Sequence, residues 1–346
     1  MTTNLLLIVL FAVIFIFLIF LFARRNTDKT DEENETDTDE LIRYLKERIA
    51  AATSADNGTD YSLSQDEINR RRNIKAKLRL LLKDCTYGDI AAKDYVKSQF
   101  AKWLVEKYGA GEQPKSVWIE RVIPFADESR LTAADKFDIL LYAYKKTCGY
   151  DALKMLIEKY KLNEPKISDD GDEYYEITAA DIEKVFSAER AALNNADKLN
   201  VAVQRVYQQF KGHGVIDEIR DMNIDGVSGG VSGVPESFSV RANNTESEGT
   251  IVPPSNYDSV WLMLGGINIH LSFLSFGSSA ELIRVCENLY RYGNPGQLTE
   301  NMGKMINRMK DGSRITVARP NFSESWVFLL RKFSSSYRSL DELYAD

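Results

Sequence analysis

The sequence predicts an α+β protein with one N-terminal transmembrane helix, an acidic linker, a helical domain and a small α+β domain with a mostly antiparallel sheet. Three observations lead to this prediction. An unbroken apolar run opens the chain, apolar residues then recur at helical spacing, and after Gly212 they recur at the spacing of strands. The expected divisions are an anchor (1–27), a linker (28–60), a helical domain (61–210), an α+β domain (211–333) and a terminal segment (334–346).

The composition bounds the class of protein. The chain has 346 residues, of which 44% are hydrophobic, and this length predicts about two domains at ~150 residues each. Such a chain is not collagen, a wholly disordered tail or a disulfide scaffold. The net charge of −7 argues against a nucleic-acid binder, which usually carries a basic field. Cys85, Cys148 and Cys286 lie far apart, so we expect free, mostly buried thiols in a reducing compartment.

The anchor is predicted from Leu5 to Ala23, a run of 19 apolar residues. About 20 residues span the hydrocarbon core of a bilayer as a helix. A cleaved signal peptide is the alternative, but it needs a basic start and a shorter apolar core, and Met1 to Asn4 carry no charged side chain. Basic residues just after the run, at positions 24, 25 and 29, favour the cytoplasmic side for the rest of the chain. We therefore expect a single-pass protein of the cell (inner) membrane.

The linker begins with a strongly acidic tract. Eight of the thirteen residues from Asp28 to Glu40 are acidic, and they follow no apolar period. This composition is typical of a disordered spacer. A short helix is expected at Leu41–Ala52, where three apolar residues recur at helical spacing.

The helical domain is predicted from apolar stripes and from their start and stop signals. Ser64 and Glu67 have the spacing of a capping box. Later helices are expected to end at Gly109, at Gly149 and before Pro165. One further helix is expected to lead from Val185 through to Phe210. The basic triplet 70–72 favours a solvated helix face, with contact to acidic lipid or a partner as the alternative.

The α+β domain is predicted from residues that alternate between apolar and polar. Val260–Leu264 and Ile267–Phe273 flank Gly265-Gly266, the signal of a two-residue hairpin. A helix is expected around residues 281–289, followed by strands at Arg314–Arg319 and Ser325–Phe333. The order is strand, strand, helix, strand, strand, which indicates a largely antiparallel sheet.

Motifs for catalysis are not found in the sequence. No G-x-x-x-x-G-K-[ST] run is present, and the glycine-rich segment Gly226–Gly233 lacks the lysine, so we interpret it as a flexible turn. His270 is expected on the polar side of its strand at the surface, and His213 in a turn. With two separate histidines, the sequence predicts no zinc site, and no catalytic residue is assigned.

Three short motifs occur in order between Lys211 and Phe333. They are Gly-His-Gly-Val-Ile-Asp at 212–217, Asp-Gly-Ser-Arg-Ile at 311–315 and Arg-Lys-Phe at 331–333. With the hairpin and the helix between them, this segment resembles the N-terminal domain of the type II/IV secretion ATPases, in particular the CpaF-type motor of the tight-adherence (Flp) pilus. In that family the first motif leads into the first strand.

The resemblance implies a hexameric, ATP-hydrolysing motor that works with platform proteins of the inner membrane. The acidic net charge, as noted, predicts no nucleic-acid partner. The resemblance also implies that Arg314 and Arg331 correspond to arginines that reach toward nucleotide phosphates, although either can be a plain surface charge. ATP and Mg²⁺ are expected only when the RecA-like motor domain is present. That domain has no counterpart before Asp346, so the chain alone is expected to be inactive, either as part of a longer motor or as a natural short protein.

Two other function classes stay open. One is a non-catalytic membrane adaptor that recruits pilus or secretion assembly partners through its helical region. The other is a membrane-bound sensor that binds a ligand through the small α+β domain.

Overall fold

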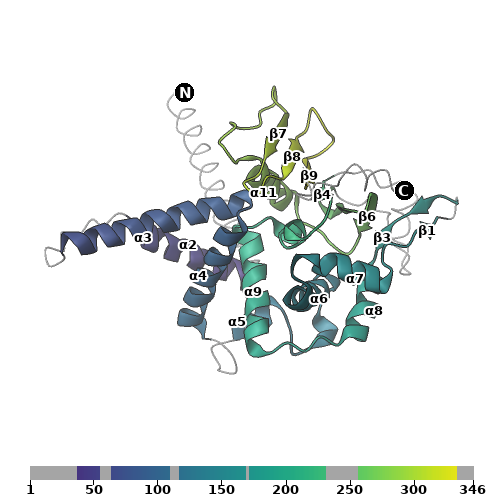
Figure 1. Cartoon of the computed structure of the whole chain (residues 1–346), viewed down its shortest axis with the longest axis horizontal. Coiled ribbons are helices and arrows are strands. Elements are labelled where there is room, and N and C mark those ends of the chain that lie inside the picture. Colours follow the sequence, from purple (N-terminus) through teal and green to yellow (C-terminus); the bar gives the residue numbers. More distant parts are fainter. Residues whose placement is uncertain (1–36, 55–63, 110–116, 169–170, 231–255, 333–346) are drawn as a thin grey trace, which may run out of the picture.

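The computed structural model describes residues 37–54, 64–109, 117–168, 171–230 and 256–332. In this part of the chain the fold is mixed α+β, with a mostly antiparallel sheet, as the sequence predicts (Figure 1). The α-helices are α2 (Asp37–Thr53), α3 (Gln65–Asp84), α4 (Ile90–Tyr108), α5 (Val117–Val122), α6 (Ala133–Cys148), α7 (Ala152–Tyr160), α8 (Ala179–Glu189), α9 (Asn195–Phe210) and α11 (Ser279–Tyr290).

Side-chain caps define where most of these helices begin. A cap oxygen accepts a hydrogen bond from the backbone N–H three residues later and satisfies a donor that has no partner within the helix. The residues that cap in this way are Ser64, Asp89, Thr132, Thr178, Asn194 and Ser278. The helix expected from Val185 to Phe210 is in fact two helices, because the chain turns at Arg190 (φ 45°) and Asn194 starts a new helix.

Part of the segment predicted as a disordered linker is helical in the structure. Residues 37–53 form helix α2, so the helix expected at residues 41–52 is confirmed and begins inside the acidic tract. Leu41 and Leu45 of α2 are buried in a core that also contains Phe100 of α4 and Tyr207 of α9. Acidic residues in the first turn suit the positive end of a helix, so an acidic composition did not prevent a helix here.

The two ends of the chain bear on the membrane prediction. The anchor (1–27) and the terminal segment (334–346) lie outside the described residues. Among the helices that are described, none is both long and apolar enough to cross a bilayer.

The strands form one seven-stranded sheet in the order β3-β6-β5-β4-β9-β8-β7 and a separate two-stranded ribbon, β1-β2. The β3–β6 pair is parallel and every other pair in the sheet is antiparallel. The strands are β1 (Lys166–Ile167), β2 (Glu173–Tyr174), β3 (Glu176–Ile177), β4 (Gly226–Gly229), β5 (Val260–Leu264), β6 (Ile267–Leu271), β7 (Lys304–Arg308), β8 (Arg314–Ala318) and β9 (Val327–Arg331).

The hairpin prediction is confirmed. Leu264 and Ile267 are the last paired residues of β5 and β6, and Gly265 and Gly266 between them have φ of 62° and 82°. A two-residue turn with positive φ at both positions matches the twist of the strands, and glycine adopts it without steric cost. The helix α11 and the strands β8 and β9 also lie where the sequence predicts them.

The glycine-rich segment was wrongly interpreted as a turn over its first four residues. Gly226–Gly229 is strand β4, which lies between β5 and β9 in the sheet. A Cβ at Gly226 would lie 2.4 Å from the carbonyl oxygen of Leu330, and one at Gly229 would lie 2.7 Å from the ring of Phe328. Glycine is therefore needed here for close packing and not for flexibility.

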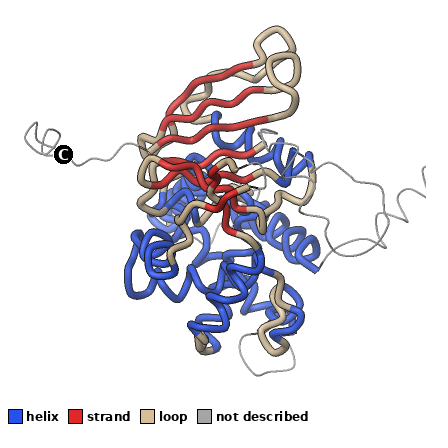
Figure 2. The backbone as a smooth tube through the Cα atoms, turned by 90° about the vertical axis from the view of Figure 1, so that its right-hand side faces the viewer, coloured by secondary structure: helices blue, strands red, loops and turns tan. Residues whose placement is uncertain are grey.

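One face of the sheet packs against helices. Residues of β4, β5, β6, β8 and β9 bury this face together with residues of α6, α7 and α11. Just after β6, Phe273 makes an edge-to-face contact with Phe137 of α6 (5.1 Å). Figure 2 shows the strands on one side of most of the helices. Strand β3 comes from the region predicted as helical, so residues on both sides of position 210 share one core.

Candidate functional site

Arg314 and Arg331, the two residues that the resemblance selects, are direct partners across β8 and β9. Arg308 of β7 is the direct partner of Arg314 on its other side. Residues directly opposite each other in an antiparallel pair point to the same face of the sheet. All three side chains are exposed, and we call Arg308, Arg314 and Arg331 the arginine row.

The arginine row lies on the open face of the sheet, opposite the helices. Ile315 and Leu330, which follow and precede arginines of the row along β8 and β9, are fully buried in the core. Because side chains alternate along a strand, the arginines point away from that core. Beyond Arg331 the next residue across the sheet is Gly226, and the sulfur of Met263 from β5 lies 3.2 Å from the place where a Cβ of Gly226 would be.

The arrangement of the row suits an anion. Like charges directly opposite each other in a sheet are unfavourable, and three neighbouring guanidinium groups raise the positive potential of this face. A guanidinium stays charged at all ordinary pH values and can bind two phosphate oxygens at once. The row can therefore hold a phosphate-bearing ligand.

The turn before Arg314 is tied to the core by Asp311. Its Oδ1 accepts a hydrogen bond from the backbone N–H of Ser313 (3.0 Å), and its Oδ2 binds the guanidinium of Arg220. Gly312 has φ of 86°, which the tight turn requires. Within the Asp-Gly-Ser-Arg motif, the first three residues thus form the turn and present the arginine.

The first two side chains of the Arg-Lys-Phe motif point to opposite sides of the sheet. Arg331 points to the open face, whereas Lys332 turns inward. The Nζ of Lys332 donates to the backbone carbonyls of Arg220 (3.0 Å) and Met222 (2.7 Å). Phe333 lies outside the described residues.

The resemblance suggests that the Gly-His-Gly-Val-Ile-Asp motif leads directly into a strand. In the structure it does not. It forms a turn and a single turn of 3₁₀-helix at Gly214–Ile216, and β4 begins nine residues after Asp217. His213 is 1% exposed and not a surface turn residue. Its backbone N–H donates to Asp217 Oδ1 (2.9 Å), and burial lowers the pKa of its imidazole.

Asp217 belongs to a buried ionic cluster that the sequence analysis did not find. Lys93 Nζ lies 2.6 Å from Asp217, 2.8 Å from Glu218 and 2.7 Å from Asp221. Burial alone would raise the pKa values of Asp217 and Glu218, but the charge of Lys93 lowers both of them. The cluster joins α4 to the turn after α9. Its one signal in the sequence is a lysine beside the buried Ala92 and Val96 of α4.

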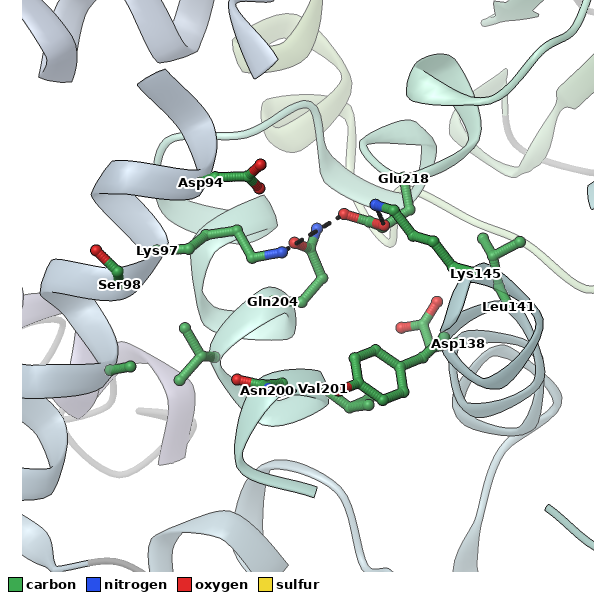
Figure 3. A pocket seen from close by; sticks show the side chains of 13 residues that line it. Asp94, Lys97, Ser98, Asp138, Leu141, Lys145, Asn200, Val201, Gln204 and Glu218 are labelled. Atoms are coloured by element: carbon green, nitrogen blue, oxygen red, sulfur yellow. Dashed lines mark hydrogen bonds and ion pairs between the residues drawn. The ribbon is translucent and has the colours of Figure 1, made fainter. Parts of the chain in front are cut away.

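A cleft of about 340 Å³ opens next to Glu218, between α4, α6 and α9 (Figure 3). Lys145 Nζ lies 2.7 Å and Lys97 Nζ 3.7 Å from the carboxylate of Glu218. Burial lowers the pKa of Lys97. The residues that line the cleft are Asp94, Lys97, Ser98, Ala101, Asp138, Leu141, Tyr142, Lys145, Asn200, Val201, Val203, Gln204 and Glu218.

The cleft has few free charges to offer a ligand. Both lysines face Glu218, and Asp138 binds the guanidinium of Arg205 (2.8 Å). The amide nitrogen of Gln204 donates to Asp217 Oδ2 (2.8 Å), which links the cleft wall to the Lys93 cluster. These pairs hold three helices together, so most charges that line the cleft are already engaged within the protein.

His270 was expected at the surface, but it is 7% exposed. It lies on the open face of the sheet, where the ring of Trp261 covers it at 4.7 Å and Glu176 of β3 lies 3.4 Å from its Nδ1. Side chains from the two neighbouring strands, β5 and β3, thus bury His270, although the alternation of apolar and polar residues predicts a surface position for it. Within the described ranges, no three His, Cys, Asp or Glu side chains are grouped to hold a metal ion.

Comparisons with known proteins do not assign a family. The sequence matches no protein-family model, and it matches no curated protein. The resemblance to the secretion ATPases therefore stays a prediction from the sequence motifs.

Proposed function

We propose that this chain is the membrane-tethered N-terminal part of a type II/IV secretion or Flp pilus assembly ATPase, which supplies hexamer contacts and part of the nucleotide cleft. One observation carries the proposal: Arg314 and Arg331 are opposite each other on the exposed sheet face. The resemblance selected these residues from two separate motifs, and their pairing provides one surface suited to phosphate.

The arginine row would contribute binding and charge stabilisation, and not the chemistry itself. Phosphoryl transfer depends on a phosphate-binding loop, on Mg²⁺ and on residues that orient the nucleophile. The chain contains no Walker A sequence. In the proposed motor, ATP and Mg²⁺ are held by a RecA-like domain, and Arg314 and Arg331 complete the cleft from the other side.

The proposed tether is the apolar run from Leu5 to Ala23 in the cell (inner) membrane. Thirteen residues separate Ala23 from the first residue of α2. A chain extends by at most ~3.5 Å per residue, so this connection spans no more than about 45 Å. The described part of the protein is then held close to the cytoplasmic surface of the membrane.

Nucleotide affinity tests the proposal. The full chain in lipid nanodiscs would be mixed with the RecA-like domain of a CpaF-type motor, and the affinity for a fluorescent ATP analogue measured by anisotropy. Hydrogen bonds to charged groups contribute ~1.5–3 kcal/mol, so Arg314→Ala or Arg331→Ala should each weaken binding by at least ~10-fold. Arg130→Ala, an exposed arginine outside the sheet, should leave affinity unchanged. Equal affinity in all variants would contradict the proposal.

The adaptor is a second candidate because the open face also carries apolar side chains. Ile306 of β7 is 65% exposed and points to the same face as the arginine row. Strand β7 is the last in the sheet order, so one of its edges has no strand beside it among the described residues. An adaptor would bind a platform protein through this edge. Loss of that partner in Ile306→Asp, with nucleotide affinity intact, would favour the adaptor, and a Walker motif in the downstream reading frame would favour the motor.

A further inference from the structure

Helix α3 carries the basic triplet at residues 70–72, and the proposed function does not use this helix. Between Arg70 and Lys83 seven residues are basic and none is acidic. Only Leu78 and Leu82 of this helix are buried, both in its second half. The first half extends away from the body of the protein (Figure 1).

Some of these charges already have partners within the protein. Lys75 donates to the backbone carbonyl of Ser54 (3.2 Å), and Arg79 donates to that of Thr53, so both satisfy the C-terminal end of α2. Arg71 lies 3.6 Å from Glu67. Arg70, Arg72 and Lys77 are exposed, and their side chains have no ion-pair partner in the described part of the chain.

The exposed side chains form a stripe. Arg70, Ile74, Lys77 and Leu80 follow at i, i+4, i+7 and i+10, which places them along one side of the helix. Ile74 is 56% and Leu80 57% exposed. We call these four residues the basic stripe. Basic and apolar side chains that alternate in this way can bind an anionic surface and insert the apolar groups at its boundary.

We propose that the basic stripe of α3 docks on the anionic lipid headgroups of the membrane that holds the tether. Charge complementarity supports this partner, since each Lys or Arg near an anionic bilayer adds about 1 kcal/mol, or roughly fivefold, to the partition. Ile74 and Leu80 favour a bilayer over a nucleic acid, whose backbone offers no apolar layer. The inference rests on the proposed tether, which keeps α3 within reach of the membrane.

Quenching by lipids that carry a nitroxide group tests this contact. A fluorophore on Asn73→Cys, next to the stripe, would report contact in full-length protein in nanodiscs. A Cys148→Ser background leaves Cys85 and Cys286, both of which are buried. We expect strong quenching with phosphatidylglycerol and weak quenching with phosphatidylcholine. A label at Met155→Cys of α7 should show no such difference.

Variants separate the stripe from the tether. Arg70→Gln with Lys77→Gln should lower the ratio of docked to free α3 by about 30-fold, and 0.5 M salt should have a similar effect. Lys154→Gln with Lys161→Gln is the matched control and should leave quenching unchanged. Equal quenching in both lipids would overturn the inference, as would binding of an oligonucleotide that depends on the stripe without lipid-dependent quenching. Protein that fails to stay in the nanodisc would contradict the tether instead.

Discussion

Lys93 and Asp217 form an ion pair of 2.6 Å although 124 residues separate them in the chain. Their side chains are 5% and 2% exposed, so the pair lies in the interior. It connects α4, in the first half of the chain, to the turn that leads into the sheet. Glu218 and Asp221 contact the same ammonium group, and one lysine thus compensates a group of buried carboxylates.

Replacing Lys93 should be strongly destabilising. Lys93→Met keeps most of the side-chain volume but leaves three carboxylates buried without their main counter-charge. Removing one partner of a buried ion pair costs about 3–5 kcal/mol. Urea denaturation followed by circular dichroism would measure the loss in the free energy of unfolding. Lys102→Met, at a lysine that is 65% exposed, should change it by less than about 0.5 kcal/mol, and equal effects of the two variants would contradict this account.

Stability should fall as the pH is lowered below the ordinary imidazole range. Burial lowers the pKa of His213 below its ordinary value of 6.5. As the pH falls, the imidazole is therefore protonated in the unfolded chain while it is still neutral in the folded protein. The stability due to this group is present above about pH 6.5 and is lost as the pH falls, by at most ~1.4 kcal/mol per pH unit. The lowered pKa values of Asp217 and Glu218 add a second loss at more acidic pH, below about 4.

Unfolding measured between pH 7.5 and 5 would detect the histidine contribution separately. His213→Gln should flatten the pH dependence in this window, even if it lowers stability at every pH. A profile that stays as steep in His213→Gln as in the wild type would show that another group titrates there.

Gly226→Ala tests the explanation for strand β4. The added methyl group would meet the carbonyl oxygen of Leu330 at 2.4 Å, so the strands must separate. Overpacking of this kind costs typically ~1–3 kcal/mol. The melting temperature and the free energy of unfolding would both fall. Ser228→Ala, in the same strand, removes an atom and should cost less, and an equal or smaller loss in Gly226→Ala would contradict the close-packing explanation.

Local signals in the sequence predicted much of the secondary structure. Ser64 and Gly149 bound helices as predicted, and Gly265-Gly266 forms the expected hairpin. These features depend on a few neighbouring residues, which a sequence shows directly. The strand at Gly226 was not predicted because its glycines are required by close contacts with Leu330 and Phe328, which lie about a hundred residues away in the sequence.

The candidate site was also predicted only where local sequence was enough to identify its residues. Each arginine of the row occurs in a short motif or a strand, but their alignment depends on the register of three strands. Arg314 and Arg331 were selected from the sequence, whereas Arg308 was not, because β7 was not predicted. The Lys93 cluster was missed for a similar reason, since its members come from two distant segments.

Arg331→Glu should separate the stability of the sheet from its proposed function. The change replaces a like-charge pair with Arg314 by an opposite-charge pair on the same face. Cross-strand pairs of opposite charge contribute roughly 0.2–1 kcal/mol, so the variant should be slightly more stable than the wild type. Its affinity for the ATP analogue should nevertheless fall by more than that of Arg331→Gln, because a carboxylate repels phosphate. Denaturation and nucleotide titration on the same preparation would measure the expected gain in stability and the expected loss of nucleotide affinity. If binding weakened only in proportion to a loss of stability, Arg331 would be a structural residue and not part of a phosphate site.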